Sequence, residues 1–357
     1  MIPIARPIIG EEEKNAVLET IDSGIIAQGP KVKAFEEVFA DYIGVNHAIA
    51  TNNGTSALHT ALLACGLGKG DEVITTPFTF IATTNSILYC GARPVFSDID
   101  RKIFNISSEE IKEKITERTK AVLIVHLYGQ ACDMKAITEI CGDYNLRLIE
   151  DACQAHGAEY KGIKTGSFGD AACFSFYPTK NMTTGEGGMI TTSNEAIAEK
   201  AMVIKEHGSR VRYQHEVLGY NYRMTDIAAA IGIEQLKKLE GFNKKRIENA
   251  TKLTRGLKDI EDIETPCIAP DVRHVFHQYT LRVKNREKVV KVMEKAGIGY
   301  GIYYPFPVHK QGLYKDYKDE KLPEAEEASR EVLSLPVHPG IGEKEIDYII
   351  TTLKEVL

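Results

Sequence analysis

Short apolar segments alternate with longer amphipathic segments between residues 45 and 192. The apolar segments have the length and composition of buried strands. Seven strands are predicted, at His47–Thr51, Glu72–Thr75, Pro94–Ser97, Ala121–His126, Arg147–Asp151, Ala171–Phe176 and Met189–Thr192. Helical spacing of apolar residues separates several of them, as at Ser56–Cys65, Phe80–Cys90 and Asp133–Asp143. This βαβ rhythm predicts an α/β domain with a mostly parallel seven-stranded sheet covered by helices.

The pattern changes after a long predicted helix at Thr225–Gly256. Beyond it we expect strands at Val275–Val283 and Tyr300–Tyr304 and helices at Arg286–Ala296, near Glu324–Leu333 and at Glu343–Leu357. This mixture is typical of a smaller α+β domain. We therefore predict a large α/β domain over residues 1–240 and a small C-terminal α+β domain over residues 241–357.

Composition and charge narrow the class of protein. Hydrophobic residues make up 43% and charged residues 26% of the 357 residues, which is typical of globular proteins. The net charge of −6 has the wrong sign for non-specific binding to nucleic acid or anionic membranes, and so favours a small-molecule substrate.

No apolar run approaches the roughly 18 residues that span a bilayer, and Met1–Gly10 lacks the features of a signal peptide. We therefore expect a cytoplasmic protein without membrane contact. The seven cysteines are widely spaced, so they indicate neither a disulfide framework nor a metal site.

A glycine-containing turn follows the first predicted strand, at Asn53-Gly54-Thr55-Ser56. Gly54 allows a tight turn, and the amides of Thr55 and Ser56 at the start of a helix could bind a phosphate. The alternative is an ordinary helix cap, which threonine and serine also favour.

Two carboxylates, Glu150 and Asp151, end the fifth predicted strand. Ligands of such sheets gather at the carboxyl ends of the strands. An aspartate there can pair with a protonated ring nitrogen, as enzymes that use pyridoxal 5′-phosphate (PLP) require. The alternatives are a helix cap or a metal-binding aspartate.

A lysine, Lys180, follows the sixth predicted strand in a loop that begins near Ser175. A lysine amine can form an imine with an aldehyde, while the serine hydroxyl five residues earlier binds a phosphate of the same cofactor. The alternative is a solvated surface lysine, the environment of most lysines.

These three segments, in this order, resemble the DegT/StrS-type (DegT/DnrJ/EryC/StrS) PLP-dependent nucleotide-sugar aminotransferases, a branch of the type I, aspartate aminotransferase-like fold. The resemblance extends over nearly the whole chain. It includes Ser23-Gly24, Gln28-Gly29-Pro30, the segments Thr76–Thr83 and His126–Gln130, and Gly219–Asp226.

The resemblance implies that Lys180 binds the cofactor covalently and then moves the proton, while Asp151 faces the pyridine nitrogen. Phe80 resembles the aromatic residue that stacks on the ring, and Gln154 the residue near the ring hydroxyl. The alternatives are core packing for Phe80 and helix capping for Gln154.

The phosphate would lie between Ser175 and the turn Gly54–Ser56. Asn221 resembles the asparagine that reaches this phosphate from the partner subunit, although turn formation is the alternative for a loop asparagine. This resemblance implies a homodimer with shared active sites. The substrate contacts that it suggests are Tyr304, His309 and Arg223, with a surface histidine as the alternative for His309.

The implied reaction begins when glutamate, or a related amino acid, converts the cofactor to pyridoxamine phosphate. The amino group then passes to a keto-sugar nucleotide. The run Tyr220–Thr225 resembles enzymes for 4-keto-6-deoxy sugars, and a 3-keto-sugar substrate is the alternative.

Three other classes of protein fit the sequence less well. A PLP-dependent sugar dehydratase of this family has histidine in place of the lysine. A non-catalytic regulatory protein of the same fold would have little need for Lys180, Asp151, Ser175 and Asn221 together. A nicotinamide-dependent enzyme is disfavoured because no G-x-G-x-x-G follows a strand.

Overall fold

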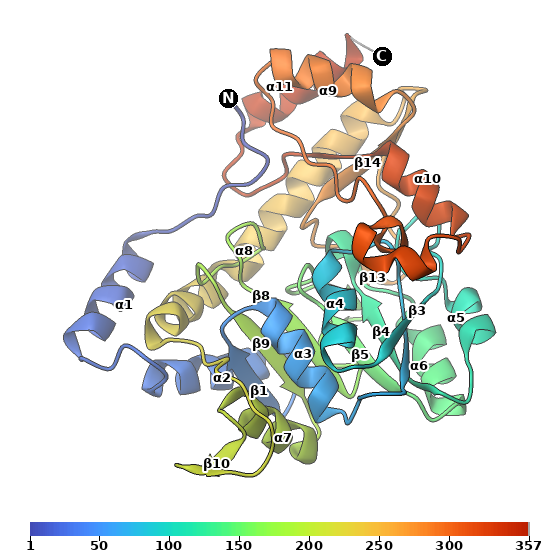
Figure 1. The fold of residues 1–357 in the computed structure, drawn as a ribbon. Helices are drawn as coiled ribbons and strands as arrows, with labels where there is room; N and C mark the ends of the chain where they lie inside the picture. Colours follow the sequence, from blue (N-terminus) through green and yellow to red (C-terminus); the bar gives the residue numbers. More distant parts are fainter. Residues whose placement is uncertain (356–357) are drawn as a thin grey trace.

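The computed structural model of the protein describes residues 1–355 and has a seven-stranded sheet at its centre (Figure 1). The strand order is β1-β9-β8-β5-β4-β2-β3. The strands are β1 (His47–Thr51), β2 (Glu72–Thr75), β3 (Arg93–Phe96), β4 (Thr119–Val125), β5 (Arg147–Asp151), β8 (Ala171–Ser175) and β9 (Gly188–Thr192). Strand β9 runs antiparallel to β1 and β8, while the other neighbouring pairs are parallel. The predicted fold class is confirmed.

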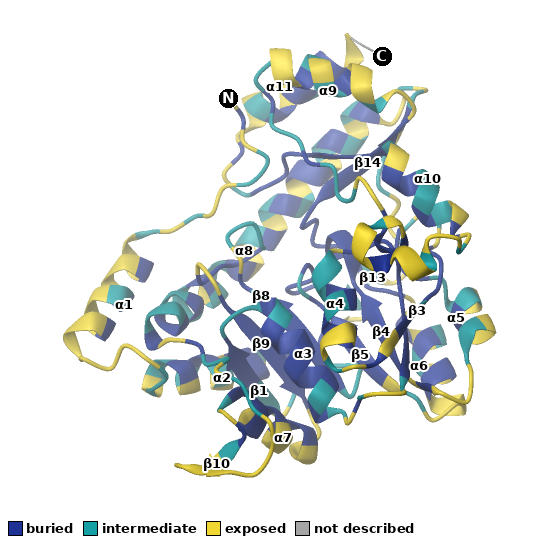
Figure 2. Cartoon of the chain, viewed as in Figure 1, coloured by how far each residue is buried: buried dark blue, intermediate teal, exposed yellow. Residues whose placement is uncertain are grey.

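Helices cover both faces of this sheet, so its central strands are apolar on both sides (Figure 2). On β4, Leu123 packs in the core under α3, whereas the neighbouring Ile124 packs in the core under α6. The helices of the large domain are α1 (Glu11–Asp22), α2 (Pro30–Ile43), α3 (Gly54–Ala64), α4 (Ile81–Tyr89), α5 (Ser108–Lys114), α6 (Met134–Asp143) and α7 (Glu195–Lys205).

A second core lies around the antiparallel sheet β12-β14-β15, whose strands are β12 (Ile263–Glu264), β14 (Tyr279–Val283) and β15 (Val332–Leu335). The helices α9 (Arg286–Lys295), α10 (Pro323–Glu331) and α11 (Glu343–Lys354) accompany it. Helix α8 (Asp226–Leu257) runs without a break from the large sheet to this second core. The domain boundary predicted between residues 240 and 241 falls inside α8 and stays a prediction.

Short strands complete the structure. Strands β6 (Glu159–Tyr160), β7 (Ile163–Lys164) and β13 (Val272–Arg273) form a small sheet. Strands β10 (Ser209–Val211) and β11 (Gln214–His215) form a hairpin that projects from the large domain.

Three predictions for the C-terminal region were wrong. Residues 300–304 form no strand; a single bridge joins Gly301 to Ser334, and the two tyrosines that follow turn toward the large domain. The helix predicted to reach Leu333 ends at Glu331, because the next four residues pair with β14. Strand β14 begins only at Tyr279.

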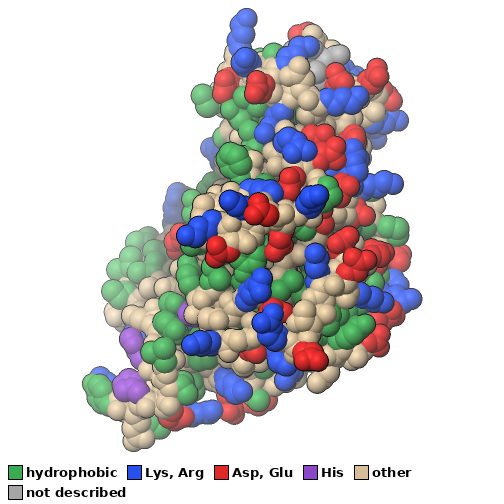
Figure 3. Space-filling model, turned by 45° about the vertical axis from the view of Figure 1, so that its right-hand side comes forward, with side chains coloured by type: hydrophobic (Ala, Val, Ile, Leu, Met, Phe, Trp, Pro, Cys, Tyr) green, Lys and Arg blue, Asp and Glu red, His purple; other side chains and the backbone are tan. Residues whose placement is uncertain are grey.

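Residues 356 and 357, in the last predicted helix, lie outside the described residues. Within residues 1–355, no helix combines the length and apolar character needed to cross a membrane. The cytoplasmic location stays a prediction. Figure 3 shows acidic and basic side chains interspersed over the face that it draws, as the modest net charge suggests.

Candidate active site

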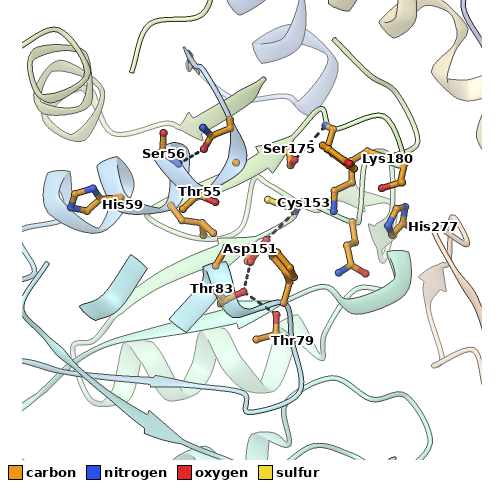
Figure 4. Close-up of a pocket in the computed structure, with 18 of the residues that line it drawn as sticks. Thr55, Ser56, His59, Thr79, Thr83, Asp151, Cys153, Ser175, Lys180 and His277 are labelled. Carbon is orange, nitrogen blue, oxygen red and sulfur yellow. Dashed lines mark hydrogen bonds between the residues drawn. The ribbon is translucent and has the colours of Figure 1, made fainter. Parts of the chain in front are cut away.

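A cavity of about 780 Å³ opens at the carboxyl ends of β5 and β8 (Figure 4). The start of α3, the start of α4 and a segment of the small domain complete its wall. Nine residues predicted from the sequence line it, namely Gly54, Thr55, Ser56, Phe80, Asp151, Gln154, Ser175, Lys180 and Tyr304. The fold thus brings together residues that are as many as 250 positions apart in the chain.

Asp151 lies at the end of β5 and is 5% exposed. Its Oδ2 accepts a 2.7 Å hydrogen bond from the Thr83 hydroxyl, and its Oδ1 accepts one of 3.2 Å from the amide of Cys153. Thr83 and Thr79 are joined in turn by a 2.9 Å hydrogen bond. These contacts fix the carboxylate and leave lone pairs to accept a further proton donor in the cavity.

Lys180 lies in the loop after β8, where its amide donates to the carbonyl of Tyr177 at 2.9 Å. Burial lowers the pKa of the Lys180 amine below its usual value, although Cys153 and Asp151 oppose this shift. A lysine with a lowered pKa is more often in the neutral form that attacks a carbonyl.

The beginning of α3 lies directly against the end of β8. A Cβ atom on Gly54 would come within 2.7 Å of the Ser175 Cβ, so only glycine allows this approach. The Asn53 side chain caps the helix, because its Oδ1 accepts from the amide of Ser56 at 2.8 Å. The cap is therefore Asn53 rather than Thr55 or Ser56, and the Ser56 amide that was predicted to bind phosphate is already engaged.

An anion can still bind beside this turn. The first amides of a helix have no partner within it, and the helix dipole favours negative charge there. The hydroxyls of Thr55, Ser56 and Ser175 line the same part of the cavity. Together these groups form a set of donors that suits a phosphate.

Phe80 and Gln154 also line the cavity. Phe80 is 56% exposed, so it is not a core residue. The Gln154 Oε1 accepts from the amide of Tyr128 at 2.9 Å, in the short 3-10 helix Leu127–Gly129, and its Nε2 donates to the Tyr304 hydroxyl at 3.2 Å. Burial raises the pKa of Tyr304, which keeps its hydroxyl protonated.

Three predicted residues are not among the described residues that line this cavity. Asn221 is exposed, and its backbone forms a bridge with Glu206. Arg223 is half-buried outside the wall. His309 is 0% exposed, and its Nε2 lies 3.2 Å from Glu326, so the surface-histidine alternative was wrong.

Sequence reasoning missed other lining residues. Thr83 belongs to the segment Thr76–Thr83 that carries the family resemblance, but the neighbouring sequence does not indicate its hydrogen bond to Asp151. His59 and Tyr222 form one end of the cavity, with the Nδ1 of His59 3.2 Å from the tyrosine hydroxyl. His277 and Tyr303 enter from the side of the small domain.

PLP has three groups that a protein must satisfy, namely an aldehyde, a phosphate and a pyridine nitrogen. Lys180, the donors around Gly54, and Asp151 supply the matching groups, and all of them line the cavity. The residues therefore fit this cofactor. The sequence matches the DegT/DnrJ/EryC1/StrS aminotransferase family over residues 7–354. The chain belongs to this family. It is accordingly a PLP-dependent aminotransferase with the type I fold.

Relatives with named activities cover nearly all of the chain. It is 42% identical to the GDP-perosamine synthase of Caulobacter vibrioides over 365 residues, which cover 100% of this chain and 98% of that protein. It is 40% identical to the dTDP-3-amino-3,6-dideoxy-alpha-D-galactopyranose transaminase of Aneurinibacillus thermoaerophilus over 341 residues, which cover 95% and 94% of the two chains.

The crystal structure of S. venezuelae DesV in complex with a ketimine intermediate is similar along its length, with a TM-score of 0.94 and 36% identity over 97% of this chain and 94% of that chain.

Proposed function

We propose that this aminotransferase moves an amino group from glutamate to the carbonyl of a keto-sugar nucleotide of the 4-keto-6-deoxy class. The observation that carries the proposal is the cavity itself, which Lys180, Asp151 and the donors around Gly54 all line. Its volume of about 780 Å³ lies within the range of small-molecule binding sites.

In this proposal Lys180 is the catalytic base. The cofactor supplies an electron sink that stabilises negative charge at the carbon that loses a proton. The Nζ of Lys180 would hold the cofactor between turnovers and, when free, would accept and return the proton that the substrate loses. Its lowered pKa keeps the amine able to accept that proton near neutral pH.

Asp151 has an electrostatic role. Its side chain is held by Thr83 and the Cys153 amide, and there it would keep the cofactor's ring nitrogen protonated. The donors at Gly54, Thr55, Ser56 and Ser175 bind the phosphate and so anchor the ring. Phe80, which also lines the cavity, would stack on the ring.

Tyr304 is the proposed substrate contact with the best support. It packs beside Phe80, with ring centroids 6.2 Å apart, and Gln154 orients its hydroxyl. Because the phenol stays protonated, it can donate a hydrogen bond to a sugar oxygen. His309 and Arg223 would need a rearrangement or a second chain to reach the sugar.

We also propose a homodimer in which Asn221 of one chain reaches the phosphate in the other. Large apolar side chains are exposed on α1 and the loop after it, at Leu18, Ile21, Ile25 and Ile26, and again near the hairpin, at Val217 and Leu218 (Figure 2). A monomer rarely leaves so much apolar surface in water. Two-fold dimers are the commonest assembly that covers it.

The position of amination separates the two candidate substrates. The resemblance of Tyr220–Thr225 supports a 4-keto sugar, whereas the relative from Aneurinibacillus thermoaerophilus is named for a 3-amino sugar. The test is to incubate the PLP-loaded enzyme with glutamate and matched 4-keto and 3-keto nucleotide sugars, and to identify the product by mass spectrometry and NMR. Amination at C4 supports the proposal, amination at C3 supports the alternative, and no amination of any nucleotide sugar contradicts both.

A further inference from the structure

A chain of two threonine hydroxyls ends at Asp151 in the wall of the cavity (Figure 4). The Thr83 hydroxyl donates to the Oδ2 of Asp151 at 2.7 Å, and the Thr79 hydroxyl lies 2.9 Å from that of Thr83. Thr83 is 1% exposed and Thr79 is 3% exposed, so water has little access to either side chain. Both contacts are therefore made inside the protein, where a hydrogen bond is electrostatically stronger than in water.

The direction of this chain follows from the number of protons. A hydroxyl carries one proton, and that of Thr83 goes to Asp151. Thr79 must then be the donor in its pair with Thr83. Both protons point along the chain toward the carboxylate, and the hydrogen bond that Thr83 accepts polarises its hydroxyl and strengthens the one that it donates.

The hydroxyl of Thr83 does not follow the usual course for a threonine in a helix. Such hydroxyls commonly bond to a backbone carbonyl in the preceding turn. In α4, Thr84 bonds in this way to the Ile81 carbonyl at 3.1 Å, and Ser86 bonds to the Thr83 carbonyl at 2.7 Å. The Thr83 hydroxyl instead reaches the end of β5, 68 residues away in the sequence. The contact with Asp151 is therefore not one that the helix itself requires.

Asp151 is held at both of its carboxylate oxygens. Its Oδ2 accepts from Thr83, which belongs to α4, and its Oδ1 accepts from the amide of Cys153, in the segment after β5. Because the two donors belong to different segments, the carboxylate cannot turn about its Cβ–Cγ bond without losing at least one of them. The Cys153 contact, at 3.2 Å, is at the long end of the usual range, so the 2.7 Å contact with Thr83 contributes most to the orientation.

The same turn of chain carries Phe80. This residue is the N-cap of α4, and its carbonyl accepts from the amide of Thr83 at 3.1 Å. The start of α4 thus joins the aromatic side chain that would stack on the cofactor ring to the hydroxyl that holds Asp151.

We propose that Thr83 is a positioning residue for Asp151, which holds the carboxylate in the orientation that meets the ring nitrogen of the cofactor, and that Thr79 directs the Thr83 proton to it. A carboxylate whose orientation is fixed before the cofactor binds loses less conformational freedom on binding. The inference rests on the proposed role of Asp151.

The test compares two ligands that differ in one ring position. Pyridoxamine phosphate has the ring nitrogen, whereas its 1-deaza analogue has a C–H group there and cannot bond to Asp151. The ratio of their dissociation constants from the apoenzyme therefore measures the preference for the nitrogen. Thr83→Val keeps the shape of the side chain and removes the hydroxyl, so we expect this preference to fall about tenfold, through weaker binding of pyridoxamine phosphate alone. Thr83→Ser returns the hydroxyl and should largely restore the preference.

Thr84→Val is the matched control. Thr84 is the next residue of α4 and is 0% exposed, its hydroxyl bonds to the Ile81 carbonyl, and it is not one of the described residues that line the cavity. This variant should keep the wild-type preference. Thr79→Val removes the donor behind Thr83 but leaves the contact with Asp151, so we expect a smaller fall of about twofold. It tests the chain even if Thr83→Val does not fold, and an unchanged preference would contradict the role of Thr79.

A structural role for this turn predicts a different result. Equal weakening of both ligands in Thr83→Val, or the same loss of preference in Thr84→Val, would overturn the proposal, as would an unchanged preference in Thr83→Val. Asp151→Ala separates the two levels of the account, because it should abolish the preference and leave Thr83→Val without further effect. If Asp151→Ala keeps the preference, the proposed role of Asp151 is itself wrong. If it abolishes the preference while Thr83→Val does not change it, only the role of Thr83 is wrong.

Discussion

Replacement of Gly54 by alanine tests whether the close contact between α3 and β8 builds the phosphate site. The new Cβ would lie 2.7 Å from the Ser175 Cβ, 3.2 Å from the Cys153 Sγ and 3.3 Å from the Ser175 Cα. Ordinary contacts between carbon atoms are about 3.5–4.0 Å, so the helix start must move by about 1 Å. Overpacking of this kind costs about 1–3 kcal/mol.

The same shift displaces the donors on α3 from those on Ser175. Loss of one hydrogen bond to a charged group costs about 1.5–3 kcal/mol, which weakens PLP binding roughly 10- to 100-fold. With about 2.1 cal/mol/K of unfolding entropy per residue, a chain of 357 residues should lose about 1–4 °C in Tm. The assays are fluorescence titration with pyridoxamine phosphate and thermal unfolding of the apoenzyme.

Gly241→Ala is the matched control. Gly241 also lies in a helix, but no atom is within 4 Å of the position that its Cβ would take. This variant should gain up to about 1 kcal/mol of helix propensity and bind the cofactor normally. Wild-type affinity and Tm in Gly54→Ala would refute the reasoning.

Further predictions concern charge, assembly and pH. Asp151→Asn should lower the amination rate by at least about a hundredfold, because an amide cannot neutralise the ring cation; steady-state kinetics would reveal a wild-type rate if Asp151 had another role. Lys180→Ala and Asn221→Asp should each be inactive, yet mixed dimers should regain one working site; hybrids that form without activity would place Asn221 outside the partner's site. Burial lowers the pKa of His274 to about 3 in the folded chain. As the pH falls below the ordinary value of 6.5, His274 therefore becomes protonated only in the unfolded chain, and the folded state loses stability. His274→Gln should therefore reduce the loss of unfolding free energy between about pH 7 and about pH 5.5 by about 1 kcal/mol, and urea titrations with equal losses in both proteins would contradict this.

The strands of the large sheet could be predicted because the apolar residues that bury them are consecutive in the sequence. Strands β1, β2 and β5 have the predicted bounds, since short apolar runs bounded by polar or turn residues form strands buried on both faces. The segment at Tyr300–Tyr304 has the same local pattern. It is not a strand, because its tyrosines complete the cavity of the other domain instead of pairing.

The residues of the active site likewise include some that could be predicted from the sequence and some that could not. Gly54, Asp151 and Lys180 could be found because each follows a strand, where ligand sites of such sheets gather. Thr83 and His277 could not, because they contact Asp151 and Asn181, which lie 68 and 96 residues away in the sequence. His309 stands between prolines and lysines in the sequence, yet it packs against Phe96 and binds Glu326 in the folded chain.

The central claim is that Lys180 holds PLP in this cavity, and covalent trapping tests it most directly. Borohydride reduction of the PLP-loaded enzyme would make the bond to the lysine nitrogen permanent, and peptide mass spectrometry would then locate it. The account predicts a pyridoxyl group on the peptide that contains Lys180, at one group per chain. A label on a different lysine, or no label in an enzyme that has bound PLP, would contradict it.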